Sequence, residues 1–254
     1  MDAKLKLVDL FERLLPRTAV RRRVASRSGP NSRSDLTTLR KYLGEGGHGQ
    51  HAAIDVGANS GLFTWPLAQL FGQVLAIEPN IERARFLERS LPANVSVLCA
   101  ACSDVYGVAR LSAPRAANGV VLHGLGKLAA NPAVGFHRVV SHGVKSWHAP
   151  LVRIDDAVAQ IKLPVSFIKI DVEGHELAAL SGAAELLNVQ RPVVFAEIEQ
   201  EHGGDTVRIY DLMASHRYVC FAVDRGTLDR CDTIERFNEA LSRPRVVNFL
   251  FEPT

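Results

Sequence analysis

Short, mostly apolar segments alternate with helical segments along this chain, and that alternation constrains its fold more than any other feature. Ala52–Val56, Gln73–Ile77 and Ser166–Ile170 are three such runs, and helical periodicity follows each of them. Strands without polar alternation are typical of parallel sheets that helices cover on both faces. The chain is therefore predicted to form a doubly wound, mostly parallel α/β sheet.

The C-terminal part departs from this alternation. The apolar segments 218–223 and 246–251 lack a strong crossover between them, although residues 232–241 have helical character. Parallel neighbours need such a crossover, so one of these two strands is expected to run antiparallel. Residues 107–154 are less regular, with a hairpin strand predicted at 108–111. The other predicted elements are strands 95–102 and 193–198 and helices 35–42, 61–71, 80–90, 175–187 and 206–216.

The first 34 residues form a separate, basic extension. They hold nine Lys and Arg against three Asp and Glu, which leaves residues 35–254 with a net charge of −3. Residues 4–15 have the periodicity of an amphipathic helix, and residues 26–32 have the composition of a linker. We expect this helix to pack on the main domain or a partner subunit, with contact to an anionic membrane surface as the alternative. The main domain is expected to span residues 35–254, and its acidic balance argues against nucleic acid as a partner.

The cysteines and the N-terminal segment indicate the cellular compartment of the protein. Cys99 and Cys102 form a C-x-x-C inside an apolar run, so we interpret them as buried small side chains rather than a redox or metal pair. No apolar stretch reaches the roughly 20 residues that a membrane span needs. Asp9 and Glu12 interrupt the N-terminal apolar run, which argues against a signal peptide, and a cytoplasmic location is expected.

Glycines and acidic residues follow the first three predicted strands. The first ends in the turn Asp55–Gly61, and the second ends in Glu78. Ser103 and Asp104 follow the third strand. Such sheets bind ligands beyond the carboxyl ends of their strands, where glycines let a ligand approach the backbone. Glu78 is placed to accept both ribose hydroxyls and Asp104 to accept from an adenine amino group, so a nucleoside pocket is predicted.

The glycine spacing distinguishes between nucleoside cofactors. Dinucleotide sites usually carry G-x-G-x-x-G, because a pyrophosphate must approach the backbone. Gly57 and Gly61 are instead spaced as G-x-x-x-G, with Asp55 two residues upstream. A carboxylate before the turn suits a cationic ligand without phosphate, and S-adenosylmethionine is cationic at its amine and its sulfonium. That cofactor is therefore favoured over NAD.

A dense group of ionisable residues follows the fourth long strand. Asp171, Glu173, His175 and Glu176 occur within six residues. Asp171 and Glu173 are expected to face the cleft, where crowded like charges raise a carboxyl pKa toward the range of a general base. His175 is a second candidate base, whereas Glu176 suits the start of the next helix. Glu197 ends the following strand and could hold a divalent ion with Asp171, but the spacing fixes no coordination geometry and no metal is assigned.

In their order and spacing, these segments resemble the FkbM family of methyltransferases. The resemblance extends from about residue 35 to residue 251. Its most specific part is the block Ile168–Glu176, and the segment from Ala113 to His148, which matches weakly, is expected to shape the acceptor pocket. The other matching segments are Asp55–Gly61, Glu78–Asn80, Ser103–Asp104, Ile154–Asp156, Gly182–Ala183, Arg191–Pro192 and Glu197.

The resemblance implies a Rossmann-like class I methyltransferase sheet, S-adenosylmethionine as methyl donor and S-adenosylhomocysteine as product. It further implies O-methylation of a sugar, a glycan or another small natural product. Asp171, Glu173 and His175 are then the candidate catalytic residues. The implied cofactor-binding residues are Asp55, Gly57, Ala58, Asn59, Gly61, Glu78, Pro79, Ser103, Asp104 and Asp171. The alternatives are an NAD-dependent oxidoreductase on a similar sheet and a non-catalytic, cofactor-binding scaffold.

Overall fold

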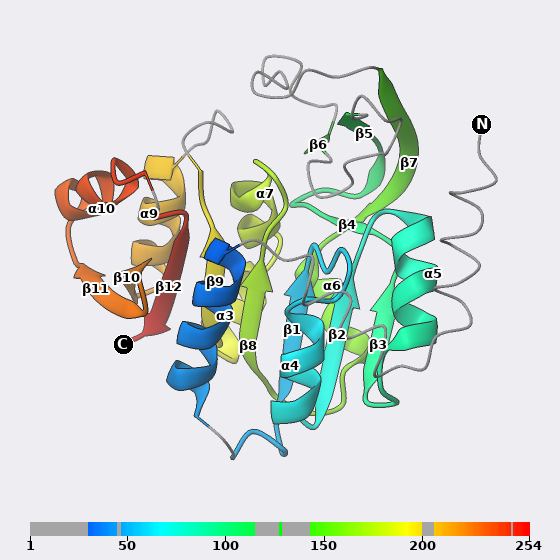
Figure 1. The fold of residues 1–254 in the computed structure, drawn as a ribbon, viewed down its shortest axis with the longest axis horizontal. Coiled ribbons are helices and arrows are strands. Elements are labelled where there is room, and N and C mark those ends of the chain that lie inside the picture. Colours follow the sequence, from blue (N-terminus) through cyan, green and yellow to red (C-terminus); the bar gives the residue numbers. More distant parts are fainter. Residues whose placement is uncertain (1–29, 45–46, 115–126, 129–142, 200–205, 245) are drawn as a thin grey trace.

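The structure is a computed structural model, and the residues that it describes are 30–44, 47–114, 127–128, 143–199, 206–244 and 246–254 (Figure 1). The helix predicted at 4–15 lies outside the described residues. The described chain begins with α3 (Pro30–Leu43), so residues 30–32 are helical and not part of an irregular linker. The helix predicted at 35–42 is therefore present but begins earlier. None of the described helices is both long and apolar enough to span a membrane.

A main sheet of eight strands forms the centre of the molecule, in the order β11-β10-β12-β9-β8-β1-β2-β3. β1 lies between β2 and β8 and pairs with both in parallel. The strand order reverses at β1, which is where doubly wound sheets bind ligands. The strands are β1 (Ala52–Val56), β2 (Gln73–Ile77), β3 (Val95–Leu98), β8 (Val165–Ile170), β9 (Val193–Glu197), β10 (Tyr218–Asp224), β11 (Thr227–Cys231) and β12 (Asn248–Pro253).

The predicted direction of the strands is confirmed. β3, β2, β1, β8 and β9 are parallel neighbours, and β12 is antiparallel to both β9 and β10. β12 is thus the antiparallel strand expected near the C-terminus. The pattern did not predict β11, which forms a hairpin with β10 through Arg225 and Gly226. Both turn residues have positive φ, 48° and 90°, as a two-residue hairpin turn requires, but arginine is an unusual residue there.

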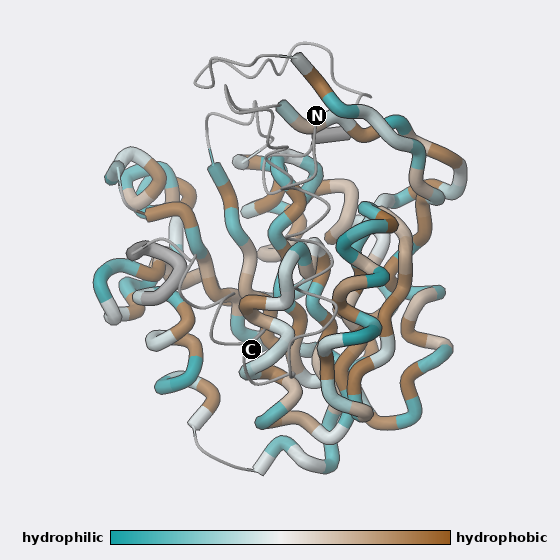
Figure 2. Tube along the Cα trace, turned by 45° about the vertical axis from the view of Figure 1, so that its right-hand side comes forward, coloured by the Kyte–Doolittle hydropathy of each residue, from teal (hydrophilic) through white to brown (hydrophobic). Residues whose placement is uncertain are grey.

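Helices cover both faces of the main sheet, as the apolar strands require (Figure 1). One face carries α3, α4 (Thr64–Leu70) and α5 (Ile81–Ser90). The other carries α6 (Ile154–Ala157) with a 3-10 turn (Val158–Gln160), α7 (Glu176–Ser181), α8 (Ala184–Val189), α9 (Thr206–Ser215) and α10 (Ile234–Leu241). Figure 2 shows the apolar stretches along the central strands between these two layers.

A second sheet lies above the main sheet in Figure 1, in the order β4-β7-β5-β6. Its strands are β4 (Ala101–Cys102), β5 (Gly107–Pro114), β6 (Lys127–Leu128) and β7 (Val144–Val152). The hairpin strand predicted at 108–111 is present as part of β5, and β7, which pairs with β5 from Val144 to Leu151, was not predicted. Residues 115–126 and 129–142 of this less regular segment lie outside the described residues. Lys145 and Pro150 interrupt the apolar alternation of β7, so its sequence pattern is too weak to identify a strand.

The strand predicted at 95–102 is in fact two strands. The N–H of Ala100 donates to the carbonyl of Leu98 at 3.1 Å, which turns the chain out of the main sheet. Residues 101–102 then pair with β7 in the second sheet. The run is apolar throughout, so hydropathy does not mark the break. Within it Cys102 is buried and Cys99 is half-buried, and both are free thiols.

The helix predicted at 175–187 is also divided, into α7 and α8. The division falls at Gly182, where a Cβ would lie 2.1 Å from the carbonyl oxygen of Ser103. A continuous helix with a larger residue at this position would push the Ser103 segment away. The missing Cβ of Gly182 therefore lets the Ser103 segment pack against the helical layer.

Asp155 connects α6 to the start of α8. Its carboxylate accepts the backbone N–H of Glu185 at 3.1 Å and that of Leu186 at 2.9 Å. Arg153 pairs with the same carboxylate at 2.8 Å. Asp155, in the first turn of α6, therefore caps a different helix, whose capped N–H of Glu185 is 30 residues further along the chain.

We expect Asp155→Ala to lower the free energy of unfolding by about 1–3 kcal/mol, because two N–H groups lose their acceptor. Asp156→Ala is the matched control. That neighbouring carboxylate accepts from the exposed hydroxyl of Tyr106, so its removal is expected to cost less than about 1 kcal/mol. Urea unfolding at pH 7 measures both values, and equal losses would contradict the capping role.

Candidate active site

The turn after β1 brings the main chains of two strands into contact. Gly57 has a φ of +77°, and a Cβ there would lie 1.8 Å from the carbonyl oxygen of Asp171. The N–H groups of Gly57 and Ala58 both donate to the carbonyl of Ile77, at 2.9 and 3.1 Å. Glycine alone tolerates both the left-handed backbone and this close contact. The turn therefore holds the ends of β1, β2 and β8 at fixed positions.

Glu78, at the end of β2, is held by two backbone donors. Its Oε2 accepts the N–H of Asn59 and its Oε1 accepts the N–H of Asn80, each at 2.8 Å. Burial raises the pKa of Glu78, against the effect of these two hydrogen bonds. A carboxylate has about four acceptor positions, so each oxygen can still accept a further donor from a ligand.

A buried ion cluster lies behind the turn. The ammonium of Lys169 is 3.1 Å from Oδ2 of Asp171 and 3.6 Å from Oδ1 of Asp55, and Asp55 also accepts the hydroxyl of Thr64 at 2.5 Å. Burial raises the pKa of Asp55, and Lys169 opposes it. Burial would lower the pKa of Lys169, but Asp171 and Asp55 outweigh it and raise the pKa. Lys169 interrupts an apolar strand, and that is the signal in the sequence that could have identified it.

The loop after β8 presents Glu173 in a left-handed backbone conformation, with a φ of 56°. Glu176 supports this loop, because its Oε1 accepts the N–H of Gly174 at 3.0 Å and that of Val172 at 3.3 Å. Glu176 is buried, and burial raises its pKa to about 6. The side chain that was expected to favour the start of α7 thus also fixes the position of a candidate catalytic residue.

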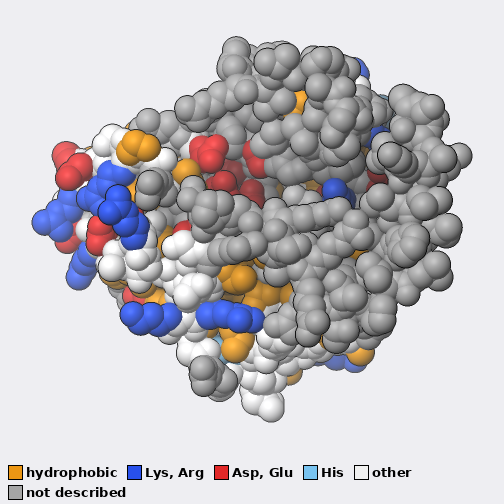
Figure 3. Space-filling model, viewed as in Figure 1, with side chains coloured by type: hydrophobic (Ala, Val, Ile, Leu, Met, Phe, Trp, Pro, Cys, Tyr) orange, Lys and Arg blue, Asp and Glu red, His pale blue; other side chains and the backbone are white. Residues whose placement is uncertain are grey.

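Carboxylates gather over the ends of β8 and β9, as expected for Glu197. Burial raises the pKa of Glu197, and Asp171, Glu199 and Glu173 raise it further. Figure 3 shows acidic side chains collected near the centre of this face. Among the described residues, no group of three or more His, Cys, Asp or Glu side chains is arranged to hold a metal ion.

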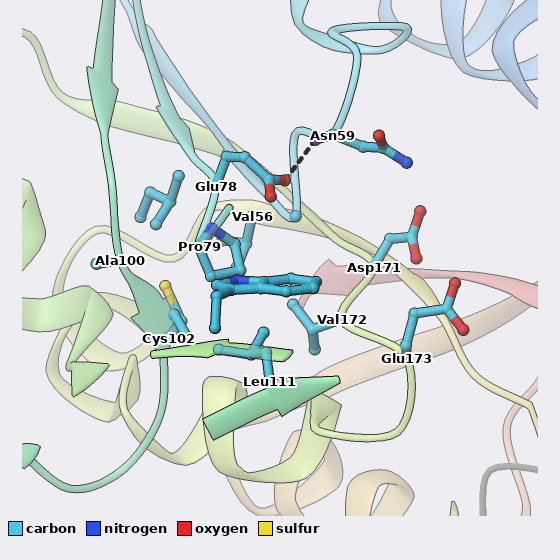
Figure 4. Close-up of a pocket in the computed structure, with 14 residues that line it drawn as sticks. Val56, Asn59, Glu78, Pro79, Ala100, Cys102, Leu111, Asp171, Val172 and Glu173 are labelled. Carbon is cyan, nitrogen blue, oxygen red and sulfur yellow. Dashed lines mark hydrogen bonds between the residues drawn. The ribbon is translucent and has the colours of Figure 1, made fainter. Parts of the chain in front are cut away.

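A cavity opens at the carboxyl ends of the strands. In Figure 4, Asp171 and Glu173 lie at one end of it, Ala100 and Cys102 lie at the other, and Glu78 lies between. The cavity therefore has an acidic end and an apolar end. Its lining residues are Val56, Gly57, Asn59, Ile77, Glu78, Pro79, Ala100, Ala101, Cys102, Leu111, Trp147, Asp171, Val172 and Glu173.

The cavity brings together six of the residues predicted from the sequence, namely Gly57, Asn59, Glu78, Pro79, Asp171 and Glu173. Three other predicted residues do not line the cavity but belong to the end of β1 or the turn that follows it. Asp55 is wholly buried in the ion cluster, and Ala58 is buried in an apolar cluster. Gly61 has a φ of +81° and packs against Leu87.

Ser103, Asp104 and His175 also lie outside the cavity lining. The premise for the first two, that they directly follow the third strand, is wrong because β3 ends at Leu98. The hydroxyl of Ser103 is 3.2 Å from Asp104 and 3.1 Å from Nε2 of His175. Burial lowers the pKa of His175, and the nearby Asp104 opposes this effect. Their roles with a cofactor or an acceptor stay predictions.

The apolar wall of the cavity is the part that sequence reasoning missed. Ala100, Ala101 and Cys102 belong to a run that was assigned to the interior of a strand. Leu111 and Trp147 face each other across β5 and β7 of the second sheet. These residues carry no chemical signature, so their place in the site depends on a sheet that the pattern did not predict.

Comparison with known proteins gives a family match. A model of the methyltransferase FkbM domain matches residues 55–220. A search of curated proteins found no match.

Solved structures of three proteins are similar in part. A methyltransferase FkbM from Methylobacillus flagellatus matches over 81% of this chain at 18% identity and a TM-score of 0.47, and this chain spans 44% of that protein. An O-methyltransferase from Bacillus cereus, solved in complex with SAH, matches over 89% of this chain and 82% of its own, at 16% identity and a TM-score of 0.46. A SAM-dependent methyltransferase from Aquifex aeolicus matches over 91% of this chain and 97% of its own, at 13% identity and a TM-score of 0.45.

Glu176→Gln changes the free energy of unfolding by a different amount at each pH. The change is expected to be about 2 kcal/mol more stabilising at pH 8 than at pH 4.5. Burial raises the pKa of Glu176 to about 6 from 4.5, so folding favours the protonated carboxyl. That contribution is fully present below pH 4.5 and is lost as the pH rises through 6. Glutamine keeps an oxygen for the N–H groups of Val172 and Gly174 and carries no charge.

Urea unfolding at pH 4.5 and pH 8 measures this difference. Glu185→Gln, at an exposed position on α8, is the matched control and is expected to show the same change at both pH values. A pH-independent effect of Glu176→Gln would contradict the assignment of a buried, charged carboxylate.

Proposed function

This chain belongs to the FkbM methyltransferase family, and from that premise we propose that it transfers a methyl group from S-adenosylmethionine to a hydroxyl of a small molecule or glycan. The fold is that of class I methyltransferases, with a mostly parallel central sheet and antiparallel C-terminal strands. The methyl donor, the oxygen acceptor and the kind of acceptor are the elements of this proposal.

The geometry of Glu78 carries the proposal for the donor. It is a buried carboxylate at the end of the second strand, held by backbone donors on both oxygens beside a turn that only glycine permits. A carboxylate at this position of a doubly wound sheet is the usual acceptor for two ribose hydroxyls. The residues present therefore fit an adenosine-containing ligand.

The two ends of the cavity fit the two ends of that ligand. Ala100, Ala101 and Cys102 offer an apolar surface suited to adenine. Asp171 and Glu173 lie at the opposite end, where an ammonium and a sulfonium would meet negative charge (Figure 4). This polarity suits S-adenosylmethionine better than a dinucleotide, whose phosphates would face the carboxylates.

The chemistry requires a base and close positioning. When bound, S-adenosylmethionine supplies a methyl group on a positively charged sulfur, whose carbon–sulfur bond breaks as the oxygen–carbon bond forms, and the electron pair stays on sulfur. Asp171 takes the proton of the acceptor hydroxyl, because it lines the cavity at the acidic end. His175 is the weaker candidate, since it does not line the cavity and its Nε2 is within hydrogen-bond distance of Ser103. Holding the reacting atoms in alignment can lower the activation barrier by about 7–11 kcal/mol.

Glu78→Gln is expected to weaken binding of S-adenosylhomocysteine about 10- to 100-fold, because one charge-assisted contact to the ribose is lost. Isothermal titration calorimetry at pH 7.5 measures the affinity. Glu82→Gln is the matched control, because Glu82 lies on the exposed side of α5 and pairs with Lys145. Unchanged affinity of Glu78→Gln would exclude the ribose role, and stabilisation of the native protein by NAD but not by S-adenosylhomocysteine would overturn the proposed donor.

Asp171→Asn is expected to weaken binding of S-adenosylhomocysteine less than about tenfold, because Glu173 keeps a negative charge at the acidic end, and to lower methyl transfer at least about 100-fold, because a general base is lost. Transfer of labelled methyl groups to pooled sugars and hydroxylated natural products measures turnover. His175→Asn serves as the comparison variant. If Asp171→Asn retains turnover and His175→Asn loses it, the base is His175.

A further inference from the structure

Lys169 lies one row below the cavity on the face of the main sheet that carries α3 and α4. It pairs in register with Asp55 of β1 and with Phe195 of β9. Side chains two residues apart share a face of a strand, so Asp171 lies on the same face, one row closer to the cavity. The row below is apolar and contains Phe167. Lys169 is therefore a charged residue between an apolar core and an acidic site, and 3% of it is exposed.

The Lys169 ammonium contacts the three parts of the chain that form the acidic side of the site. It lies 3.1 Å from Asp171, 3.6 Å from Asp55 and 3.4 Å from the carbonyl oxygen of Gly57, to which it donates a hydrogen bond. It also lies 5.1 Å from the centre of the Phe63 ring, a cation–π distance. These partners belong to the end of β1, the turn that follows it, the approach to α4, and the end of β8.

The influence of Lys169 extends to two further carboxylates that it does not touch. Burial raises the pKa of Glu78 and of Glu197, and Lys169 opposes the rise at both. The ammonium therefore pairs directly with Asp55 of β1 and with Asp171 after β8, and its charge also favours the ionised form of Glu78 after β2.

We propose that Lys169 is a positioning residue for the cofactor site: its buried ammonium is the shared counter-ion of Asp55 and Asp171 and ties both carboxylates to the glycine turn. Lys169 does not line the cavity, so it acts through the groups that do. Close carboxylates away from water cannot all ionise without a cation among them. This inference rests on the proposed function, because its consequence is the binding of an adenosine-containing ligand.

The decisive variant is Lys169→Met, which keeps the length of the side chain and removes its charge. Asp55 would then be buried without a partner, which destabilises a protein strongly. Asp55→Asn/Lys169→Met is therefore the second variant, because it removes both charges of the deepest pair. Lys145→Met is the matched control: Lys145 pairs with Glu82 at the surface, at 2.8 Å, and lines no part of the cavity.

The measurement is the affinity for S-adenosylhomocysteine by calorimetry between pH 6 and pH 9. In Lys169→Met and in the double variant, the pH at which affinity reaches half its maximum is expected to rise by about one unit or more relative to the wild type. Without the ammonium, Glu78, which lines the cavity, holds its proton to higher pH and accepts the ligand's donors less well. The profile of Lys145→Met is expected to coincide with that of the wild type, which also corrects for titration of the ligand.

Two results would overturn the proposal in distinguishable ways. If the wild type binds and the double variant is folded but shows the wild-type pH profile with a uniform loss of affinity, Lys169 only fills space and pairs with Asp55. If the wild type does not bind S-adenosylhomocysteine at any pH, the proposed function fails and this inference fails with it.

Discussion

The contact between Gly57 and the carbonyl group of Asp171 is the constraint on which the site depends. A Cβ at Gly57 would come within 1.8 Å of that oxygen, so the turn after β1 and the end of β8 lie as close as two main chains can. The same turn donates two hydrogen bonds to Ile77 at the end of β2. The backbone alone therefore fixes three strand ends relative to one another. The distance between Asn59 and Glu78, and the exposure of Asp171 to the cavity, follow from that arrangement.

Such an arrangement concentrates carboxylates in a place with little water, where they lose hydration and repel one another. A buried cation offsets part of this unfavourable energy. Lys169 occupies the row between the apolar core, at Phe167, and the acids at the cavity. Replacing an ion pair of this kind by apolar residues often stabilises a protein, so the persistence of charge here is not explained by stability. It is better explained by the proposed site, in which ionised carboxylates would attract a cationic ligand. Binding and stability thus make opposite demands on the same few residues.

The sequence predicted strands and site residues correctly wherever a pattern is compatible with only one kind of structure. Unbroken apolar runs with acids or glycines at their ends identified the parallel strands and placed Gly57, Glu78 and Asp171 at one edge of the sheet. It was insufficient where a pattern had two meanings. The apolar run that ends at Cys102 continues through a change of sheet, and β7 carries too many polar residues for its alternation to be recognised. Lys169 interrupts an apolar strand, which marks it as unusual, but its partners Asp55 and Gly57 are distant along the chain. The full set of partners is a tertiary property that local spacing does not reveal.

The second sheet explains the positions of Ser103 and His175, two residues that the sequence pattern assigned to cofactor binding or catalysis. Ser103 follows β4, and its N–H donates to Val152 at the end of β7. Its carbonyl oxygen lies against Gly182, at the break between α7 and α8, and its hydroxyl lies 3.1 Å from His175 at the start of α7. These contacts connect the sheet that carries Trp147 to the helices that follow the acidic strand end. The main sheet supplies the charged groups of the cavity, and the second sheet supplies its apolar wall. Ser103 therefore joins the second sheet to the helical layer, and through that layer the apolar wall is held relative to the charged groups.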